Sequence, residues 1–235
     1  YGVKACRVEV IAGYPITPQT PIMEKLAELC STGELRAKFI PVESEHSAMA
    51  ACIAAASVGV RTFTATSSQG LGLMHELLHW AAGARLPIVM VNVNRAMAPP
   101  WNLSTDQNDS LSQRNTGWLQ FYCESNQEVI DTMIQAYRIS ERVMLPTMVN
   151  MDAFVLSHIS EPVEIPDQEL VDRYLPPYEP EFKLDVDDPH TFGAGSDLYI
   201  NFRYKIQQAM EQAKEVVGEE DRDFRALFGR GYGFM

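Results

Sequence analysis

Short runs rich in β-branched residues alternate with longer helical patterns from residue 8 to about residue 155, and this alternation constrains the fold more than any other feature. Several of the runs are apolar at nearly every position, which is typical of strands buried on both faces. The alternation predicts an α/β fold, a mostly parallel open sheet with helices on both faces. The expected strands are residues 8–12, 37–42, 61–65, 87–92, 118–123 and 146–151, and the expected helices are residues 20–30, 45–57, 70–82 and 126–142.

A polar stretch at residues 95–114 separates the fourth expected strand from the fifth. It is too polar for a core element and too long for a plain turn, so we predict a functional loop there.

The pattern then changes in the last third of the chain. Residues 161–189 are rich in proline and acidic residues and predict an extended segment that wraps a surface. Residues 198–217 predict one amphipathic helix, and the glycines of residues 228–234 indicate a linker. We therefore divide the chain into a first domain, residues 1–160, and an appended part, residues 161–235, that leads toward a second domain.

The chain carries 19 Lys and Arg residues against 31 Asp and Glu residues, a net charge of −12. This acidic excess, without a basic stretch, argues against nucleic acid or an anionic membrane surface as the partner. The apolar runs are strand-sized and far short of the ~20 residues that a membrane helix needs. No basic and apolar leader precedes the first expected strand, so we expect a cytoplasmic protein.

The cysteines form no C-x-x-C pair, so the chain encodes neither a zinc ribbon nor a run of iron–sulfur ligands. They are Cys6, Cys30, Cys52 and Cys123. We expect reduced, packed thiols, although the count also allows a disulfide pair.

His75 and His79 bracket a literal H-E-x-x-H motif, which on a helix binds Zn²⁺ with Glu76 as general base. The surrounding residues are apolar, and no later helix offers a clear third ligand. We therefore favour packed histidines over a zinc hydrolase here.

Three prolines stiffen residues 14–21, Tyr-Pro-Ile-Thr-Pro-Gln-Thr-Pro, directly after the first expected strand. A rigid backbone there would hold the hydroxyls of Thr17 and Thr20 at the carboxyl edge of the sheet, where open α/β sheets bind ligands. The competing interpretation is a plain helix start, with Thr17 as N-cap and Pro18 as the first helical residue.

Two carboxylates, Glu43 and Glu45, lie where the second expected strand meets the alanine-rich helix. Simple capping of the helix dipole by either one accounts for them. A carboxylate turned into an apolar cleft would instead bind its proton more tightly and share it with a ring nitrogen.

Arg114 ends the polar loop. Its planar guanidinium fits a carboxylate through two parallel hydrogen bonds, which suits capture of a small organic acid. A surface arginine paired with Asp106 or Asp109 is the alternative.

Six segments occur in the order and spacing of one known family. They are Tyr-Pro-Ile-Thr-Pro-Gln-Thr-Pro at 14–21, Val-Glu-Ser-Glu-His-Ser-Ala at 42–48, Thr-Ala-Thr-Ser-Ser-Gln-Gly-Leu at 64–71, Val-Asn-Val-Asn-Arg-Ala at 91–96, Ala-Pro-Pro-Trp-Asn-Leu at 98–103 and Gln-Arg-Asn-Thr-Gly-Trp at 113–118. Over essentially its whole length the chain resembles the alpha subunits of multi-subunit pyruvate:ferredoxin oxidoreductases and of relatives that use other 2-oxoacids. The resemblance implies the pyrimidine-binding domain of a thiamine diphosphate enzyme.

The resemblance also implies an activity, in anaerobic metabolism: oxidative decarboxylation of a 2-oxoacid, with pyruvate as first candidate, to acyl-CoA (acetyl-CoA) and CO₂, with electrons passed to ferredoxin, or the reverse synthesis. Matching the family's motifs makes Glu45 the glutamate that faces the pyrimidine ring nitrogen, with Tyr14 and Pro15 beside the cofactor. By the same match, Thr17 lies near the substrate and Arg114 clamps its carboxylate.

The chain contains neither a Gly-Asp-Gly segment for Mg²⁺ and the diphosphate nor cluster cysteines, so the resemblance places these on partner subunits. The expected partners are a diphosphate-binding subunit, a subunit that carries iron–sulfur clusters and a gamma-type subunit, with coenzyme A as co-substrate. The alternative from another class is a non-catalytic assembly module of such a complex.

Overall fold

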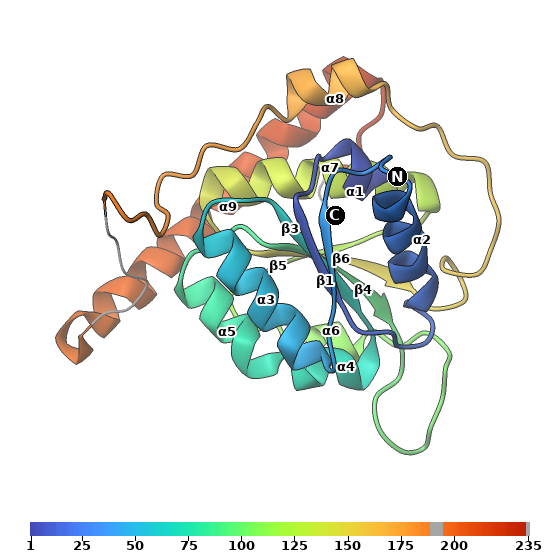
Figure 1. The fold of residues 1–235 in the computed structure, drawn as a ribbon, viewed down its shortest axis with the longest axis horizontal. Coiled ribbons are helices and arrows are strands. Elements are labelled where there is room, and N and C mark those ends of the chain that lie inside the picture. Colours follow the sequence, from blue (N-terminus) through green and yellow to red (C-terminus); the bar gives the residue numbers. More distant parts are fainter. Residues whose placement is uncertain (189–194, 234–235) are drawn as a thin grey trace.

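All six expected strands form one sheet, in which every described pair of neighbours is parallel (Figure 1). The computed structural model describes residues 1–188 and 195–233. The strand order is β2-β1-β3-β4-β6-β5. The strands are β1 Val10–Gly13, β2 Lys38–Pro41, β3 Thr62–Thr66, β4 Val89–Asn94, β5 Leu119–Tyr122 and β6 Thr147–Asp152.

Helices cover both faces of the sheet, as the alternating pattern predicts (Figure 1). Neighbouring residues of one strand point to opposite faces, so Ile11 packs in the cluster that contains the helices α2 and α7, and Ala12 packs against α3 and α5. The helices are α1 Gly2–Ala5, α2 Thr20–Ser31, α3 Glu45–Ser57, α4 Ser68–Leu73, α5 His75–Gly83, α6 Asn108–Leu111 and α7 Asn126–Val143. The predicted fold class is therefore confirmed.

Two of the expected helices show how local chemistry sets their bounds. α3 covers the expected residues because the Ser44 hydroxyl accepts the Ser47 backbone N–H at 3.2 Å and caps the first turn. The single helix expected at residues 70–82 is wrong, because the chain forms α4 and α5 with a break at Met74. Gly70 and Gly72 lie in α4, and glycine is the weakest non-proline helix former.

The direction of the connections reverses at β1. From β1 the chain passes to β2 at one edge of the sheet and then returns to β3 on the other side of β1. Open parallel sheets bind ligands at such a reversal, in the crevice outside the carboxyl ends of the strands. The topology therefore directs attention to the loops that follow β1 and β3.

The C-terminal part of the chain shares the core of the sheet domain. The helix α8 Gln168–Tyr174 interrupts the proline-rich segment, and α9 Tyr199–Phe228 follows the short 3-10 helix Ser196–Leu198. Tyr174 and Phe224 lie in the same buried cluster as the strand residue Ile11. The amphipathic helix expected at residues 198–217 is present as α9 but continues for eleven residues more.

The glycine-punctuated end of the chain, for which we predict a linker, contacts α7 through Arg230 and Tyr232. Gly229 ends α9 with φ +71°, and the guanidinium of Arg230 then pairs with the buried carboxylate of Asp131 at 2.7 Å. The Tyr232 hydroxyl donates to the same carboxylate, also at 2.7 Å. Residue 234 lies outside the described residues.

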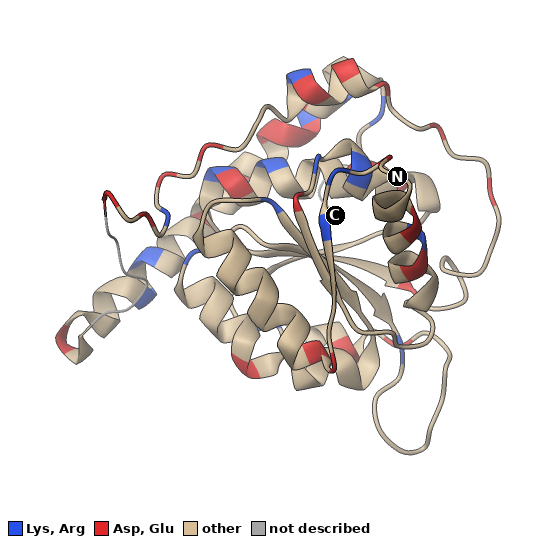
Figure 2. Ribbon diagram, in the orientation of Figure 1, with Lys and Arg blue, Asp and Glu red and all other residues tan. Residues whose placement is uncertain are grey.

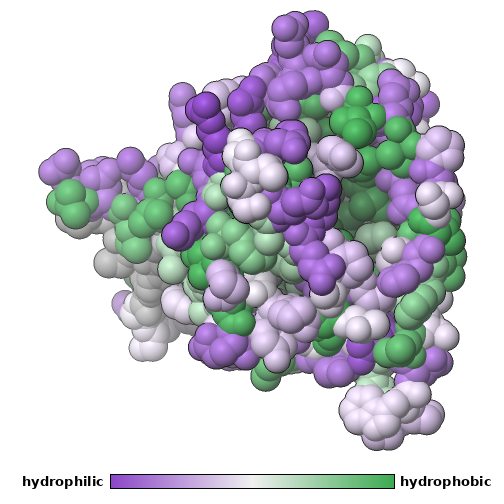
Figure 3. Space-filling view, turned by 45° about the vertical axis from the view of Figure 1, so that its right-hand side comes forward, coloured by the Kyte–Doolittle hydropathy of each residue, from purple (hydrophilic) through white to green (hydrophobic). Residues whose placement is uncertain are grey.

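Charged residues occur on most helices and connecting segments (Figure 2). On the face shown in Figure 3, hydrophobic residues form separate patches among hydrophilic ones. No helix in the described part of the chain is long and apolar enough to cross a membrane. The four cysteines are free thiols, and burial raises the pKa of Cys52 to about 12.

Candidate functional site

The proline-rich loop after β1 is tied to the end of β3. The buried side chain of Gln19 donates from Nε2 to the Ala65 carbonyl at 2.8 Å and accepts the Ile16 backbone N–H at 3.3 Å. The loop contains a cis peptide bond between Thr17 and Pro18. Thr17 remains exposed and is not a helix cap, because Gln19 occupies the N-cap position of α2. The structure therefore contradicts the alternative of Thr17 as an N-cap.

Burial separates the two glutamates that follow β2. Glu43 is exposed and its carboxylate accepts the Ser47 hydroxyl at 3.1 Å. Glu45 begins α3 with only 7% of its surface exposed, and its carboxylate forms no hydrogen bond or ion pair with any described residue. A buried carboxylate without a partner is costly unless another group binds it. Glu45 is therefore the better candidate for contact with a ligand.

Gly70 provides the space in front of Glu45. A Cβ atom at Gly70 would lie 2.6 Å from Glu45 Oε1 and 2.5 Å from Thr66 Oγ1, closer than atoms pack. The absence of a side chain at this one position therefore allows the Glu45 carboxylate to lie against α4 at the end of β3.

Further buried polar atoms around this edge have no hydrogen-bond partner among the described residues. They are Thr66 Oγ1, Ser67 Oγ, Asn94 Oδ1 and Arg95 Nε. Buried polar atoms in native proteins are nearly always satisfied, so unpaired ones gathered at a switch point indicate a ligand. Together with the unpartnered carboxylate of Glu45, these atoms fit a heteroaromatic ring that carries both hydrogen-bond donors and hydrogen-bond acceptors.

Arg95, immediately after β4, is the arginine that contacts the proline-rich loop. Its Nη1 donates to the Thr17 carbonyl at 2.5 Å, and its Nη2 donates to Gln69 Oε1 at 2.9 Å. Burial lowers the pKa of the guanidinium, and the Asp109 carboxylate opposes that shift. A largely buried cation therefore lies beside Thr17, the residue that we expected near a substrate.

Arg114 lies elsewhere in the loop. It is exposed, and its Nη1 donates to the Leu111 carbonyl at 3.3 Å. In the described part of the chain no contact joins it to Thr17 or Glu45. It also pairs with neither aspartate of the alternative, because Asp106 accepts the Asn108 backbone N–H and Asp109 binds strand-end groups.

The H-E-x-x-H residues lie at the start of α5. His75 Nδ1 is 2.5 Å from Gln113 Oε1, and the His75 and His79 rings meet edge to face at 5.0 Å. Glu76 faces His46 at 3.6 Å. No three metal-ligating side chains gather within the described ranges.

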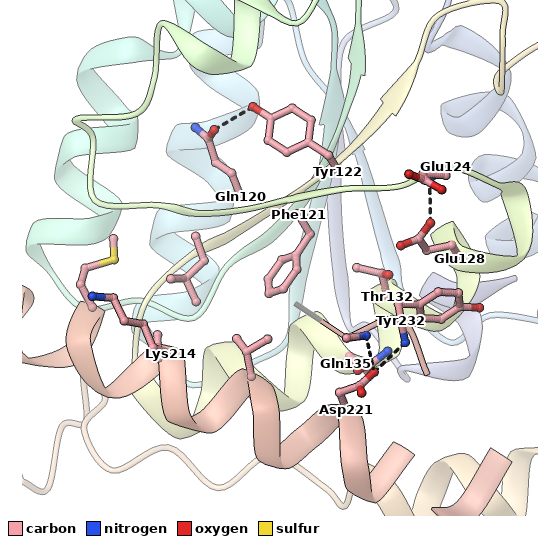
Figure 4. A pocket seen from close by; sticks show the side chains of 15 residues that line it. Gln120, Phe121, Tyr122, Glu124, Glu128, Thr132, Gln135, Lys214, Asp221 and Tyr232 are labelled. Atoms are coloured by element: carbon pink, nitrogen blue, oxygen red, sulfur yellow. Dashed lines mark hydrogen bonds between the residues drawn. The ribbon is translucent and has the colours of Figure 1, made fainter. Parts of the chain in front are cut away.

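A separate cavity of about 520 Å³ lies on the β5 side of the sheet, between β5, α7, α9 and the end of the chain. In Figure 4 the Phe121 side chain is directed toward α9. The Tyr122 hydroxyl donates to Gln120 Oε1 at 2.9 Å. None of the expected site residues lines this cavity, and β5 is at the opposite edge of the sheet from β2. We therefore place the candidate site at the β1–β3 reversal.

Fold and site together define a class: a parallel α/β domain that presents an unpaired buried carboxylate at the switch point of its sheet. A model of the family "Pyruvate flavodoxin/ferredoxin oxidoreductase, thiamine diP-bdg" matches residues 1–222. The chain belongs to this family of thiamine diphosphate-binding domains.

Relatives with similar sequences match nearly the whole chain. The ketoisovalerate oxidoreductase subunit VorA of Pyrococcus horikoshii is 57% identical over all of this chain. The pyruvate synthase subunit PorA of Methanothermobacter thermautotrophicus is 50% identical over 99% of it. The chain spans 60% and 62% of the length of these two relatives.

Solved structures support the fold. The 2-oxoglutarate:ferredoxin oxidoreductase of Magnetococcus marinus, solved with 2-oxoglutarate, coenzyme A and succinyl-CoA bound, matches with a TM-score of 0.64 at 17% identity. The match covers 90% of this chain and 43% of that one.

Sequence reasoning missed Arg95 and Gly70 as site residues. Both lie just past the carboxyl ends of expected strands, and in a parallel sheet those ends share one edge. Their position after strands could have indicated a place near the site. Whether Arg95 or Arg114 reaches Thr17 depends on the direction of the side chain, which the sequence does not show.

Proposed function

We propose that this chain is the pyrimidine-binding part of a thiamine diphosphate-dependent 2-oxoacid:ferredoxin oxidoreductase. The observation that carries the proposal is the unpartnered carboxylate of Glu45, a residue only 7% exposed, which lies against Gly70 at the carboxyl edge of the sheet. The bound cofactor supplies a carbon nucleophile once its aminopyrimidine has exchanged a proton. Glu45 would share that proton with the ring nitrogen as a general acid and base.

Other residues would bind the cofactor and orient the substrate. Tyr14 and Pro15 are exposed at the start of the proline-rich loop and would contact the pyrimidine ring of the cofactor. The Thr17 hydroxyl would donate to the oxoacid, and a guanidinium would hold its carboxylate until CO₂ leaves. Arg95 is the better placed of the two candidate arginines because it already contacts Thr17, and Arg114 remains the second candidate.

The remaining parts of the reaction belong to partner subunits in this proposal. One subunit binds the diphosphate with Mg²⁺, one carries the iron–sulfur clusters that reduce ferredoxin, and a gamma-type subunit completes a cytoplasmic complex. Coenzyme A accepts the acyl group as co-substrate. The relatives named above are themselves subunits, which supports this division of labour.

The substrate is a 2-oxoacid, with pyruvate and 2-oxoisovalerate as the two candidates. Subunits of enzymes for each are at least 50% identical to this chain, so overall similarity does not select one. Rates of the complete complex with pyruvate, 2-oxoisovalerate and 2-oxoglutarate, each with coenzyme A and a dye acceptor, would identify it.

The decisive experiment compares Glu45→Gln with Glu43→Gln in the complete complex. General acid–base catalysis contributes about 10²- to 10⁴-fold, so we expect a loss of that size in oxoacid-dependent dye reduction from Glu45→Gln alone. Calorimetry would show weaker thiamine diphosphate binding for the same variant. Normal activity and normal cofactor affinity in Glu45→Gln would favour the non-catalytic assembly module.

A further inference from the structure

The carboxylate of Asp109, in α6, is fully buried and is surrounded by donors. Oδ2 accepts the backbone N–H groups of Ser68 at 3.0 Å and Arg95 at 3.1 Å, and the Asn92 amide at 3.1 Å. Oδ1 accepts the Asn94 amide at 2.8 Å and its neighbour's backbone N–H at 2.7 Å. Asp109 forms no salt bridge in the described part of the chain, so its hydrogen bonds all come from neutral donors, and the Arg95 guanidinium acts on it only at longer range.

Two of the groups that Asp109 binds, the backbone N–H groups of Ser68 and Arg95, follow β3 and β4 beside the proposed site. Ser68 follows β3 in a left-handed conformation, with φ +52°, and begins the helix in which Gly70 lies against Glu45. Arg95 follows β4, and its guanidinium reaches the Thr17 carbonyl. One buried carboxylate therefore sets both loops relative to each other.

A second set of contacts connects the same two loops. The Ser68 hydroxyl oxygen lies 2.7 Å from the Ala96 carbonyl and 2.7 Å from Gln69 Oε1, and its single proton can be donated to either of them. Gln69 Oε1 also accepts the Arg95 guanidinium. Two hydrogen bonds thus position Arg95. Its backbone N–H donates to Asp109, and its guanidinium donates to Gln69, the residue after Ser68.

We propose that Asp109 is a positioning residue for the substrate carboxylate, acting through Arg95. This inference rests on the proposed function and deepens it. A carboxylate is required because all five of its partners are donors. An asparagine would turn its own N–H₂ group toward at least one of them and leave buried donors without an acceptor.

The test is Asp109→Asn in the complete complex, with Asp106→Asn as the matched control. Asp106 lies three residues away, and an asparagine there still accepts the Asn108 backbone N–H. Loss of hydrogen bonds to a buried carboxylate predicts a rise of about tenfold in KM for the oxoacid, with kcat and thiamine diphosphate affinity changed by less than about threefold. A fall in kcat and cofactor affinity with unchanged KM would overturn the inference.

Coupling to Arg95 distinguishes positioning from a general structural role. If Asp109 acts through Arg95, then Asp109→Asn raises KM in the wild-type background and has no further effect in an Arg95→Ala background. Independent, multiplying effects would overturn the inference. An unchanged KM in Arg95→Ala alone would instead contradict the role of Arg95 in the proposed function, whatever Asp109→Asn does.

A milder substitution is needed if the complex that carries Asp109→Asn does not assemble. Asn94→Ala removes one donor to Asp109 and leaves the carboxylate in place. We then expect a rise of about threefold in KM that disappears in the Arg95→Ala background. An unchanged KM in Asn94→Ala would overturn the inference in that case.

Discussion

The guanidinium of Arg95 donates to the main-chain carbonyl of Thr17 at 2.5 Å, across 78 positions of sequence. The contact joins the loop after β4 to the loop after β1. At β1 the direction of the connections between strands reverses. It places a buried positive charge beside the main chain of Thr17, the two residues to which we assign the oxoacid in the proposed function.

The two arginines can be separated by Arg95→Ala and Arg114→Ala in the complete complex. Loss of a charge-assisted hydrogen bond costs about 1.5–3 kcal/mol, so Arg95→Ala should raise KM for the oxoacid about 10- to 100-fold. Arg114→Ala should have a smaller effect because its side chain is exposed. Steady-state kinetics measures both, and a rise in KM from Arg114→Ala alone would return the clamp role to Arg114.

Gly70→Ala should weaken cofactor binding. Its methyl group would lie 2.6 Å from Glu45 Oε1 and 2.5 Å from Thr66 Oγ1, so the Glu45 carboxylate would have to leave its present position. We expect at least tenfold weaker thiamine diphosphate binding by calorimetry. The matched control is Gly83→Ala, where a Cβ meets nothing within 4 Å. Equal cofactor affinity in the two variants would show that cofactor binding does not depend on the position of the Glu45 carboxylate.

Arg61→Ala should be strongly destabilising. Arg61 Nε binds Glu141 at 2.6 Å, both side chains are largely buried, and the guanidinium also donates to the Cys6 carbonyl at 3.1 Å. Removing one partner of a buried pair costs about 3–5 kcal/mol, because the other charge stays buried. Chemical unfolding measures this loss. Its control is Arg7→Ala, which breaks an exposed pair with Asp172 and should cost about 0–1 kcal/mol.

Acid should release the end of the chain. Burial raises the pKa of Asp221, but the backbone N–H groups of Gly233 and Tyr232, together with Arg225, outweigh it and leave the pKa below its usual value. A carboxyl group with a lowered folded-state pKa stabilises the fold above its unfolded pKa of about 3.9, and that stability is lost as pH falls through the folded value.

Asp221→Asn tests this pH dependence. The difference in unfolding free energy between wild type and Asp221→Asn should be largest above pH ~5 and shrink as the pH falls below ~4. Hydrogen exchange at the Tyr232 amide, which donates to Asp221 at 2.7 Å, would locate the effect. A difference that stays constant over this range would contradict the assignment.

Several features of the fold were readable from the sequence because their causes are local. The strands follow from β-branched, apolar runs, and α3 begins where Ser44 accepts the Ser47 N–H. The loops that carry Thr17 and Glu45 were placed at the carboxyl edge of the sheet because they follow strands.

The length of α9 and the packed end of the chain were not readable, because partners distant in sequence decide them. Arg230 is held by Asp131, 99 residues away. A glycine-rich segment has the same composition whether or not it finds such a partner. Its docking therefore had to come from the tertiary structure.

The sequence by itself determined the fold class, the family resemblance and the loops in which the candidate site lies, since periodicity and motif spacing are properties of the chain. Only the tertiary structure decided which side chains meet there. Glu45 rather than Glu43 is buried because α3 turns it toward Gly70, and Arg95 rather than Arg114 reaches Thr17 because β4 ends beside that loop. Burial and contact depend on what packs opposite a residue, and no local pattern encodes that.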